Sequence, residues 1–153
     1  MKRLCVLLMI LCLMFSAVAH AEPWRVFDNA GLFTEEDIVV IEEAIFTFQR
    51  ATNIDFAVLT TDDYLGGETK AISDYFYDVM NFGFGSQASG MLFYIDMNRR
   101  VPCVTTSGDM ILLFNPVLES ALYACHPFLK EGAYKDAVLK MIELATEAVM
   151  TNK

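Results

Sequence analysis

The chain has 153 residues, a formal net charge of −9 and 55% hydrophobic residues. This length fits one domain with a sizeable core. The negative charge repels nucleic acid and anionic lipid, which argues against nucleic-acid binding as the function.

The first 21 residues have the pattern of a secretory signal peptide. Lys2 and Arg3 precede the apolar run LCVLLMILCLMF, and Ala19-His20-Ala21 is a small-x-small cleavage site. The run is shorter than the roughly 20 residues that span a bilayer, although an uncleaved anchor helix is the alternative.

We therefore expect cleavage before Glu22. The product, residues 22–153, would be one secreted or periplasmic (extracytoplasmic) domain without a membrane span. Because Lys2 and Arg3 leave with the signal, 9 of the 11 basic residues remain against 20 acidic ones, a net charge of −11.

The first helix of the domain is expected at about residues 34–51, after a short extended stretch at Arg25–Phe27. Thr34 is a good N-cap, and the three acids that follow it suit the positive end of the helix dipole. Apolar residues then recur at spacings of three and four, which predicts one buried stripe: Ile38, Ile41, Ile45 and Phe48.

Two short apolar runs, Ile54–Leu59 and Met91–Ile95, predict buried strands. Between them, Thr69 can cap a second helix that ends in the glycine-rich NFGFGSQASG. A tight turn after Ile95 leads to a strand at about residues 100–106, so this pair is expected to be a β-hairpin.

The C-terminal part is expected to be helical. Asn115-Pro116 provides a cap and a Pro at the first helical position, and Pro127 is expected to break or kink that helix. A last helix begins at about Tyr134. Helices that alternate with buried strands predict an α/β fold with a mixed, mostly parallel sheet covered on both faces.

Cys103 and Cys125 remain after signal cleavage. They can form a disulfide in an exported protein, or stay as two buried thiols, and the residues leave both open. His126 stands beside Cys125, but sequence neighbours do not make a nucleophile–base pair. We expect His126 near a helix C-terminus, facing the dipole. Two Cys and one His also lack zinc-site spacing.

Four aspartates follow the predicted strands: Asp28, Asp62, Asp63 and Asp96. If the strands are parallel, these carboxylates gather at one edge of the sheet, where open α/β sheets bind ligands. Clustered carboxylates need a cation or a proton between them, and hard oxygens suit calcium or magnesium. The alternative is ordinary turn chemistry, which the residues favour for Asp28 taken alone.

The segment Ser86–Gly90 follows Gly83 and Gly85 and can present backbone amides to an anion. Arg99 and Arg100 are candidate phosphate ligands from the hairpin, or else charged turn residues that keep the sheet edge soluble. The segment matches neither the P-loop nor the dinucleotide fingerprint, so a flexible loop is the alternative.

The order of several motifs resembles the TPM domain family over about residues 25–148: VFDNAGLFTEED, IDFAVLTT, FGFG, GMLFYI, RRV, a Gly near 108, Pro127-Phe128 and Gly132-Ala133-Tyr134. The resemblance implies a three-layer αβα sandwich outside the cytoplasm. It also implies that some relatives bind calcium in an acidic cleft, that acid phosphatase activity is attributed to some, and that others are auxiliary or assembly factors.

Asp28 falls on the family's Asp before Ala-Gly, and Gly85 on its Gly after the second helix. The chain departs from the family where Ala88-Ser89-Gly90 replaces an Asp-Asn-Gly type turn, which removes an acidic side chain. It also ends at Lys153, where many relatives continue into a membrane helix or a Gly-rich tail, so we expect a free domain.

Two functions are therefore considered. The first is an exported auxiliary module that binds an unknown protein partner in the cell envelope or outside, with Ca²⁺ as the implied ion. The second is a metal-assisted acid phosphatase that uses Asp28, Asp62 and Asp63. The first is favoured because the residues contain no evident nucleophile.

Overall fold

The computed structural model describes residues 24–152. The expected signal peptide, residues 1–21, lies outside the described residues and stays a prediction. Within residues 24–152, no helix is both long enough and apolar enough to cross a bilayer.

A four-stranded sheet forms the middle of the domain. Its strands are β1 (Val26–Asp28), β2 (Asp55–Thr61), β3 (Gly90–Asp96) and β4 (Val101–Ser107), in that spatial order. β1, β2 and β3 are parallel, and β4 pairs antiparallel with β3. The predicted mixed, mostly parallel sheet and its hairpin are confirmed.

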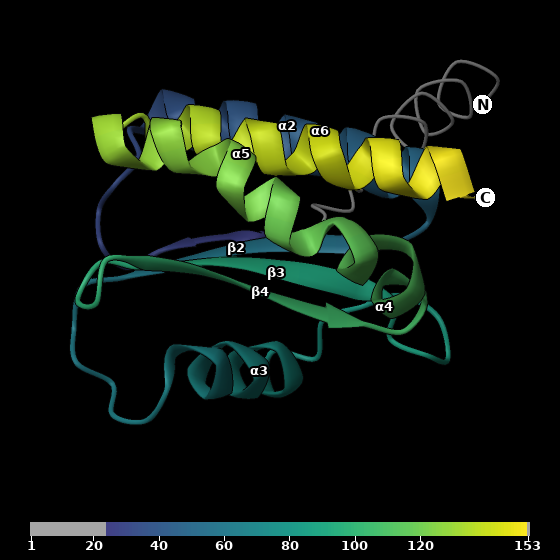
Figure 1. The fold of residues 1–153 in the computed structure, drawn as a ribbon, viewed down its shortest axis with the longest axis horizontal. Coiled ribbons are helices and arrows are strands. Elements are labelled where there is room, and N and C mark those ends of the chain that lie inside the picture. The colour runs from purple at the N-terminus through teal and green to yellow at the C-terminus, as the bar shows by residue number, and fades with distance from the viewer. Residues whose placement is uncertain (1–23, 153) are drawn as a thin grey trace, which may run out of the picture.

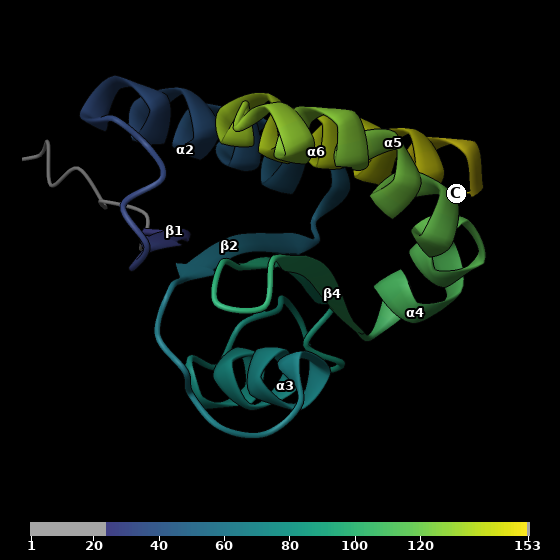
Figure 2. The same cartoon turned by 60° about the vertical axis from the view of Figure 1, so that its left-hand side comes forward.

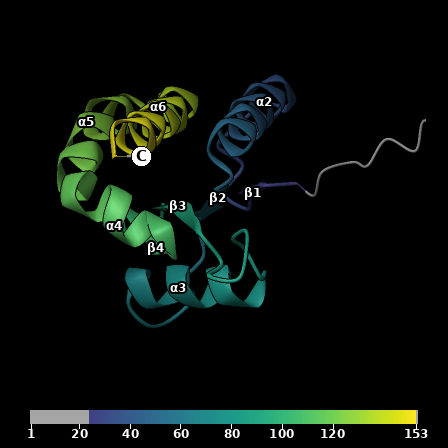
Figure 3. The same ribbon diagram turned by 90° about the vertical axis from the view of Figure 1, so that its right-hand side faces the viewer.

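Helices cover both faces of the sheet (Figures 1, 2 and 3). One face carries α2 (Glu35–Thr52), α5 (Leu118–Glu131) and α6 (Tyr134–Asn152), and the other carries α3 (Thr69–Val79). α4 (Asp109–Phe114) and the 3₁₀ turn η1 (Asn115–Val117) link β4 to α5 at one end. The expected three-layer αβα sandwich is confirmed.

Helix α2 begins where its cap predicts. The Thr34 hydroxyl accepts from the Asp37 amide, and the Asp37 carboxylate accepts from the Thr34 amide, both at 3.1 Å. This reciprocal capping satisfies two amides that the helix leaves unpaired. The helix ends at Thr52, and its C-cap residue Asn53 adopts the left-handed conformation (φ 58°).

The sheet separates two cores. Along β2, Phe56 and Val58 pack beneath α2 and α6, whereas Ala57 and Leu59 pack against α3. This alternation follows from the two-residue period of a strand. Because β2 is buried on both faces, its middle residues, 56–59, form a continuous apolar run in the sequence.

Two expectations for the C-terminal part are corrected. The six-residue helix α4 was not predicted, and η1 precedes α5, so the α-helix begins at Leu118 and not at Pro116. Of the break or kink expected at Pro127, the break does not occur, because α5 continues to Glu131. Pro127 is exposed in the penultimate turn, where its ring lies on the solvent side and the lost hydrogen bond is near the helix end.

Candidate functional site

The carboxyl ends of β1, β2 and β3 lie at one edge of the sheet, which we call the rim, together with the β3–β4 turn (left in Figure 1). All four aspartates proposed as metal ligands lie on the rim or in a loop that leaves it: Asp28, Asp62, Asp63 and Asp96. Since open α/β sheets bind ligands at this edge, the rim is the candidate site.

Asp28 fixes the loop between β1 and α2. Its Oδ1 accepts hydrogen bonds from the Leu32 amide (2.9 Å) and the Thr60 hydroxyl (2.5 Å). Its Oδ2 accepts from the Phe33 amide at 2.9 Å. Both oxygens therefore bind groups of the chain itself, as an Asp in a turn does.

Asp96 is fully buried and is paired with Arg99. Its Oδ1 accepts from the Arg99 amide (3.0 Å), and its Oδ2 accepts from the Thr69 hydroxyl (2.8 Å) and from Arg99 Nη1 (3.0 Å). Burial alone raises the pKa of Asp96, but these hydrogen bonds and the nearby guanidinium outweigh it and hold the pKa below its ordinary value. Arg99 also donates to the Gly67 carbonyl at 2.6 Å.

Asp28 and Asp96 point to opposite faces of the sheet. Asp28 is in register with Thr60, whose neighbours Phe56 and Val58 face α2. Asp96 is in register with Thr61 and meets Thr69, the first residue of α3. The structure thus gathers their strands at one edge but does not bring the two carboxylates together.

Asp62 and Asp63 lie in the loop that leaves β2, and both are exposed. Their carboxylates make no hydrogen bond or ion pair with any described residue. The loop is tied down through its backbone instead, because Asn98 Nδ2 donates to the Asp62 carbonyl at 3.3 Å. These two carboxylates are the ones on the rim that are available to a ligand.

The rim, as arranged, offers few free oxygens to a metal ion. Calcium takes about six to eight oxygen ligands. Asp28 and Asp96 are already occupied by donors of the chain, and Arg99 brings a positive charge to Asp96. Within residues 24–152, no three His, Cys, Asp or Glu side chains are grouped so as to hold a metal ion. These donors do not fit a complete metal centre, and the predicted metal site stays a prediction.

An apolar groove of about 600 Å³ adjoins the rim on the α3 side. We call it the α3 groove; loop residues 65–67 and the α3 residues Ala71, Ile72, Tyr75 and Phe76 line it, with Asn29 and Thr61 at its rim end. Leu65 and Tyr75 leave 53% and 69% of their surfaces exposed. Pockets of this size and composition bind small ligands or side chains of a partner.

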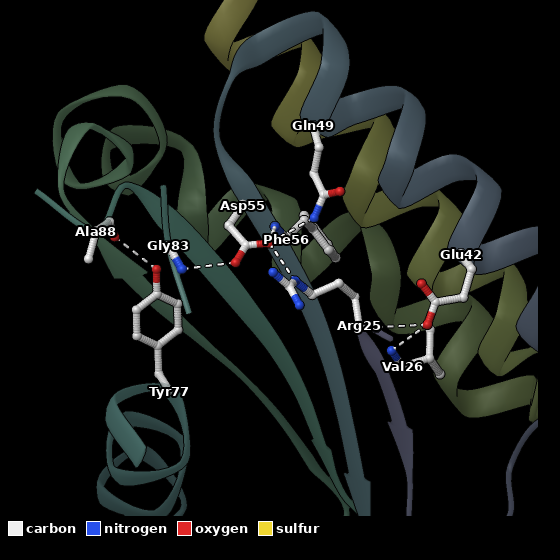
Figure 4. A network of polar contacts seen from close by, with 9 residues as sticks. All are labelled: Arg25, Val26, Glu42, Gln49, Asp55, Phe56, Tyr77, Gly83 and Ala88. Atoms are coloured by element: carbon white, nitrogen blue, oxygen red, sulfur yellow. Dashed lines mark hydrogen bonds and ion pairs between the residues drawn. The ribbon is translucent and has the colours of Figure 1, made fainter. Parts of the chain in front are cut away.

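A second polar centre, missed by the sequence analysis, surrounds Asp55 at the opposite edge of the sheet (Figure 4). Asp55 is 1% exposed. Its Oδ1 accepts from Arg25 Nε and Gln49 Nε2, both at 2.8 Å, and from the Phe56 amide at 2.9 Å. Its Oδ2 accepts from the Gly83 amide at 2.9 Å.

The Asp55 network ties four separate segments together. It joins Arg25, which precedes β1, to helix α2, strand β2 and the loop after α3. Glu42 of α2 adds bonds to the amides of Arg25 and Val26, both at 2.8 Å. Every oxygen of Asp55 is satisfied, so the centre is structural. An acid inside the apolar run IDFAVL was the available signal, because buried acids are almost always paired.

In the loop before β3, three backbone amides donate to carbonyls of the loop itself and are not free to bind an anion. The Phe84 and Ser89 amides donate to each other's carbonyls, at 3.0 and 2.9 Å, and the Ala88 amide donates to the Gly85 carbonyl at 3.2 Å. Arg99 lies beyond the other end of β3, a seven-residue strand and so roughly 20 Å away. The hairpin arginines therefore cannot assist an anion at this loop, which corrects that expectation.

The two cysteines lie on opposite faces of the sheet and are free. Cys103 packs against the α3 core, whereas Cys125 lies in the main core, where its thiol donates to the Ala137 carbonyl at 3.5 Å. Burial raises the pKa of Cys125 to about 11. His126 is exposed in the penultimate turn of α5, so it does not face the buried Cys125 thiol.

A family model described as the TPM domain matches residues 26–148. No curated protein shows significant similarity to the chain.

Three solved bacterial structures share the fold. The N-terminal domain of a P. gingivalis protein has 16% identity over 86% of each chain, with a TM-score of 0.74. The N-terminal domain of the cg2496 protein from Corynebacterium glutamicum has 14% identity over 87% of each chain (TM-score 0.67). The BA42 protein of Bizionia argentinensis has 15% identity over 78% of this chain and 82% of its own (TM-score 0.68).

Proposed function

The chain belongs to the TPM domain family, and we propose that it acts outside the cytoplasm as a binding module that holds a partner protein in the α3 groove. One observation carries this proposal. The carboxylates of Asp28 and Asp96 bind the chain's own donors, while Leu65 and Tyr75 of the adjoining groove remain exposed and are not covered by any other part of residues 24–152.

The groove is suited to a single apolar side chain of a partner. Leu65 and Tyr75 flank it, and Ile72 and Phe76 form its floor between α3 and the sheet. Burying one large apolar side chain there gives about 1.5–3 kcal/mol. Aromatic residues such as Tyr75 are frequent among the residues that dominate binding energy.

The charges beside the groove indicate which residues flank the apolar side chain of the partner. Asp62, Asp63 and Glu68 are exposed in the loop between β2 and α3. None of the three carboxylates has an ion-pair or hydrogen-bond partner within the described chain. Complementary charge steers and orients a partner. The partner segment is therefore an apolar side chain flanked by Lys or Arg.

The proposal is tested with two short peptides, acetylated Lys-Phe-Lys and Glu-Phe-Glu, titrated while backbone amide signals are recorded by NMR. The basic peptide is expected to shift the signals of residues 65–67 and 71–76, and the acidic peptide is not. The variants Leu65→Ser and Tyr75→Ser should weaken the response. Tyr123→Ser is the matched control, because Tyr123 is 79% exposed on α5, away from the groove. Equal responses to both peptides would overturn the proposal.

A calcium-dependent form of this function would use Asp62 and Asp63, the two free rim carboxylates. Calorimetry of the protein with calcium, repeated with the Asp62→Asn/Asp63→Asn variant, tests it. Heat of binding that disappears in the variant supports an ion at this loop. Binding that persists in the variant, or no binding at all, rules that ion site out.

The alternative, a metal-assisted acid phosphatase, has less support. Both oxygens of Asp28 are occupied, and Arg99, a cation at the rim, already binds Asp96 and Gly67. Hydrolysis of p-nitrophenyl phosphate at acid pH that is lost in Asp62→Asn would make the enzyme the better proposal. A hydrolysis rate equal to that in buffer alone would exclude the phosphatase proposal.

A further inference from the structure

We propose that a second cleft, between the β3–β4 hairpin and the α5–α6 turn, binds an apolar monocarboxylate. This hairpin cleft has a volume of about 680 Å³. Ile95, Met97 and residues 100–102 line it from the hairpin; His126, residues 129–132 and Tyr134 line it from the helices.

The cleft holds two cations that have no acidic partner among residues 24–152. Five of the described basic side chains have an acidic partner: Arg25, Lys70, Arg99, Lys135 and Lys140. A sixth, Arg50, lies over the Phe46 ring. The remaining two described cations, Arg100 and Lys130, both line the hairpin cleft.

The position of these cations is unexpected in so acidic a chain. All 20 acidic residues of the chain except Glu22 lie within residues 24–152, so a basic side chain finds a partner easily, yet Arg100 and Lys130 have none within this range. Both come from separate segments of the chain and meet at one cleft. Two unpaired cations beside a partly enclosed pocket attract an anion and form charge-assisted hydrogen bonds with it.

Other polar groups of the cleft fit a carboxylate head group. His126 and the Tyr134 hydroxyl line it and make no hydrogen bond with any described residue. A phenol hydroxyl can donate to a carboxylate oxygen. Glu131 lines the same cleft and opposes a second negative charge, so a monoanion fits better than a phosphate dianion.

The apolar walls of the cleft indicate that the ligand has an apolar body attached to its head group. Ile95, Val101, Pro102 and Leu129 give it an aliphatic wall, which a small ion such as acetate does not cover. Ligand pockets typically combine such walls with a few polar groups that fix orientation. The ligand is therefore a carboxylate on an apolar body.

The test uses octanoate as the probe, with binding followed by amide chemical shifts of the purified protein. Octanoate is expected to shift the amide signals of Arg100 and Val101 and those of residues 129–134. Octanol, which lacks the charge, and acetate, which lacks the apolar body, should bind at least about tenfold more weakly, since hydrogen bonds to charged groups contribute that much or more.

Variants separate specific recognition from general attraction. Arg100→Gln/Lys130→Gln should weaken octanoate binding at least about tenfold. Arg50→Gln removes a cation that lies outside the cleft, over the Phe46 ring, and should leave binding unchanged. Equal affinity for octanol, or no effect of the double variant, overturns the proposal. Tighter binding of octyl phosphate overturns the choice of a carboxylate head. These signals belong to residues outside the α3 groove, so this result and that of the proposed function are independent.

Discussion

Asp28 and Asp96 end two strands at the same edge of the sheet but face opposite sides of it, Asp28 beneath α2 and Asp96 against α3. A shared edge therefore does not make a shared site. Strand residues one position apart point to opposite faces, so the register decides which carboxylates can meet. Each of the two acids instead holds one loop of the rim in place.

Replacing Asp28 should destabilise the fold. Asp28→Ala removes the acceptor for the Leu32 and Phe33 amides and for the Thr60 hydroxyl. Leaving partly buried donors without partners costs about 3 kcal/mol in free energy of unfolding. Urea unfolding measures this loss.

The matched control for Asp28 is Asp62→Ala, because Asp62 is exposed and its side chain has no partner in the described chain. Its stability should stay within about 0.5 kcal/mol of the wild type. Asp28→Asn, which keeps one acceptor oxygen, should fall between them. A wild-type stability for Asp28→Ala would show that the loop does not depend on this carboxylate.

Asp96 should make the fold sensitive to acid. Its pKa in the folded protein is below the ordinary value of 3.8. A lowered folded pKa adds stability that is present above the unfolded value and is lost as the pH falls through the folded one. Stability should therefore drop as the pH falls below about 4. Urea midpoints measured from about pH 6 to about pH 3 follow this loss.

Asp96→Asn isolates that contribution. The hydrogen bond from Lys135 also lowers the pKa of Asp37, so the wild type loses stability from two acids over the same range. The variant should be less stable than the wild type at neutral pH, because Arg99 loses its charged partner. It should also show a flatter pH dependence. Parallel curves for the two proteins would exclude Asp96 as a source of the acid sensitivity.

Gly90 and Tyr77 should be energetically coupled. A Cβ at Gly90 would lie 2.5 Å from the Tyr77 hydroxyl oxygen and 3.0 Å from the Asp55 Cβ. That hydroxyl donates to the Ala88 carbonyl at 3.0 Å. Burial and the nearby Asp55 carboxylate raise the pKa of Tyr77, so it remains a neutral donor. Gly90→Ala therefore overpacks the site and should cost about 1–3 kcal/mol.

A double-mutant cycle measures this coupling. Tyr77→Phe alone should cost about 1 kcal/mol for the lost hydrogen bond. In the Gly90→Ala background the same change also removes the oxygen that clashes, so its cost should shrink or reverse. Additive effects of the two changes would show that the added methyl group is accommodated without contact with Tyr77.

The sequence predicted the elements that carry a clear period. Of the predicted stripe, Ile41, Ile45 and Phe48 are buried and Ile38 is only half-buried, and the cap at Thr34 sets the start of α2. Helix α4 was missed because six residues span fewer than two turns, too few to show a helical period. Local patterns therefore located the long helices and the strands.

The site depends on information that local patterns do not contain. That Asp28 and Asp96 diverge follows from strand register, and that Arg100 and Lys130 share a cleft follows from the packing of the hairpin against α5. The sequence did not predict the polar centre at Asp55, because its partners are residues 25, 49 and 83, which are far apart in the chain. Long-range pairing decides these features.

Cys103 and Cys125 should both be free thiols, because the sheet lies between them and neither can reach the other. Alkylation in denaturant without reductant, followed by peptide mass analysis, should find both modified. In the native protein both should react slowly at neutral pH, since burial raises both pKa values and lowers the thiolate fraction. Cys125 is fully buried and should be the slower. A peptide pair linked through Cys103 and Cys125 would contradict the fold itself, because the two residues pack on opposite faces of the sheet.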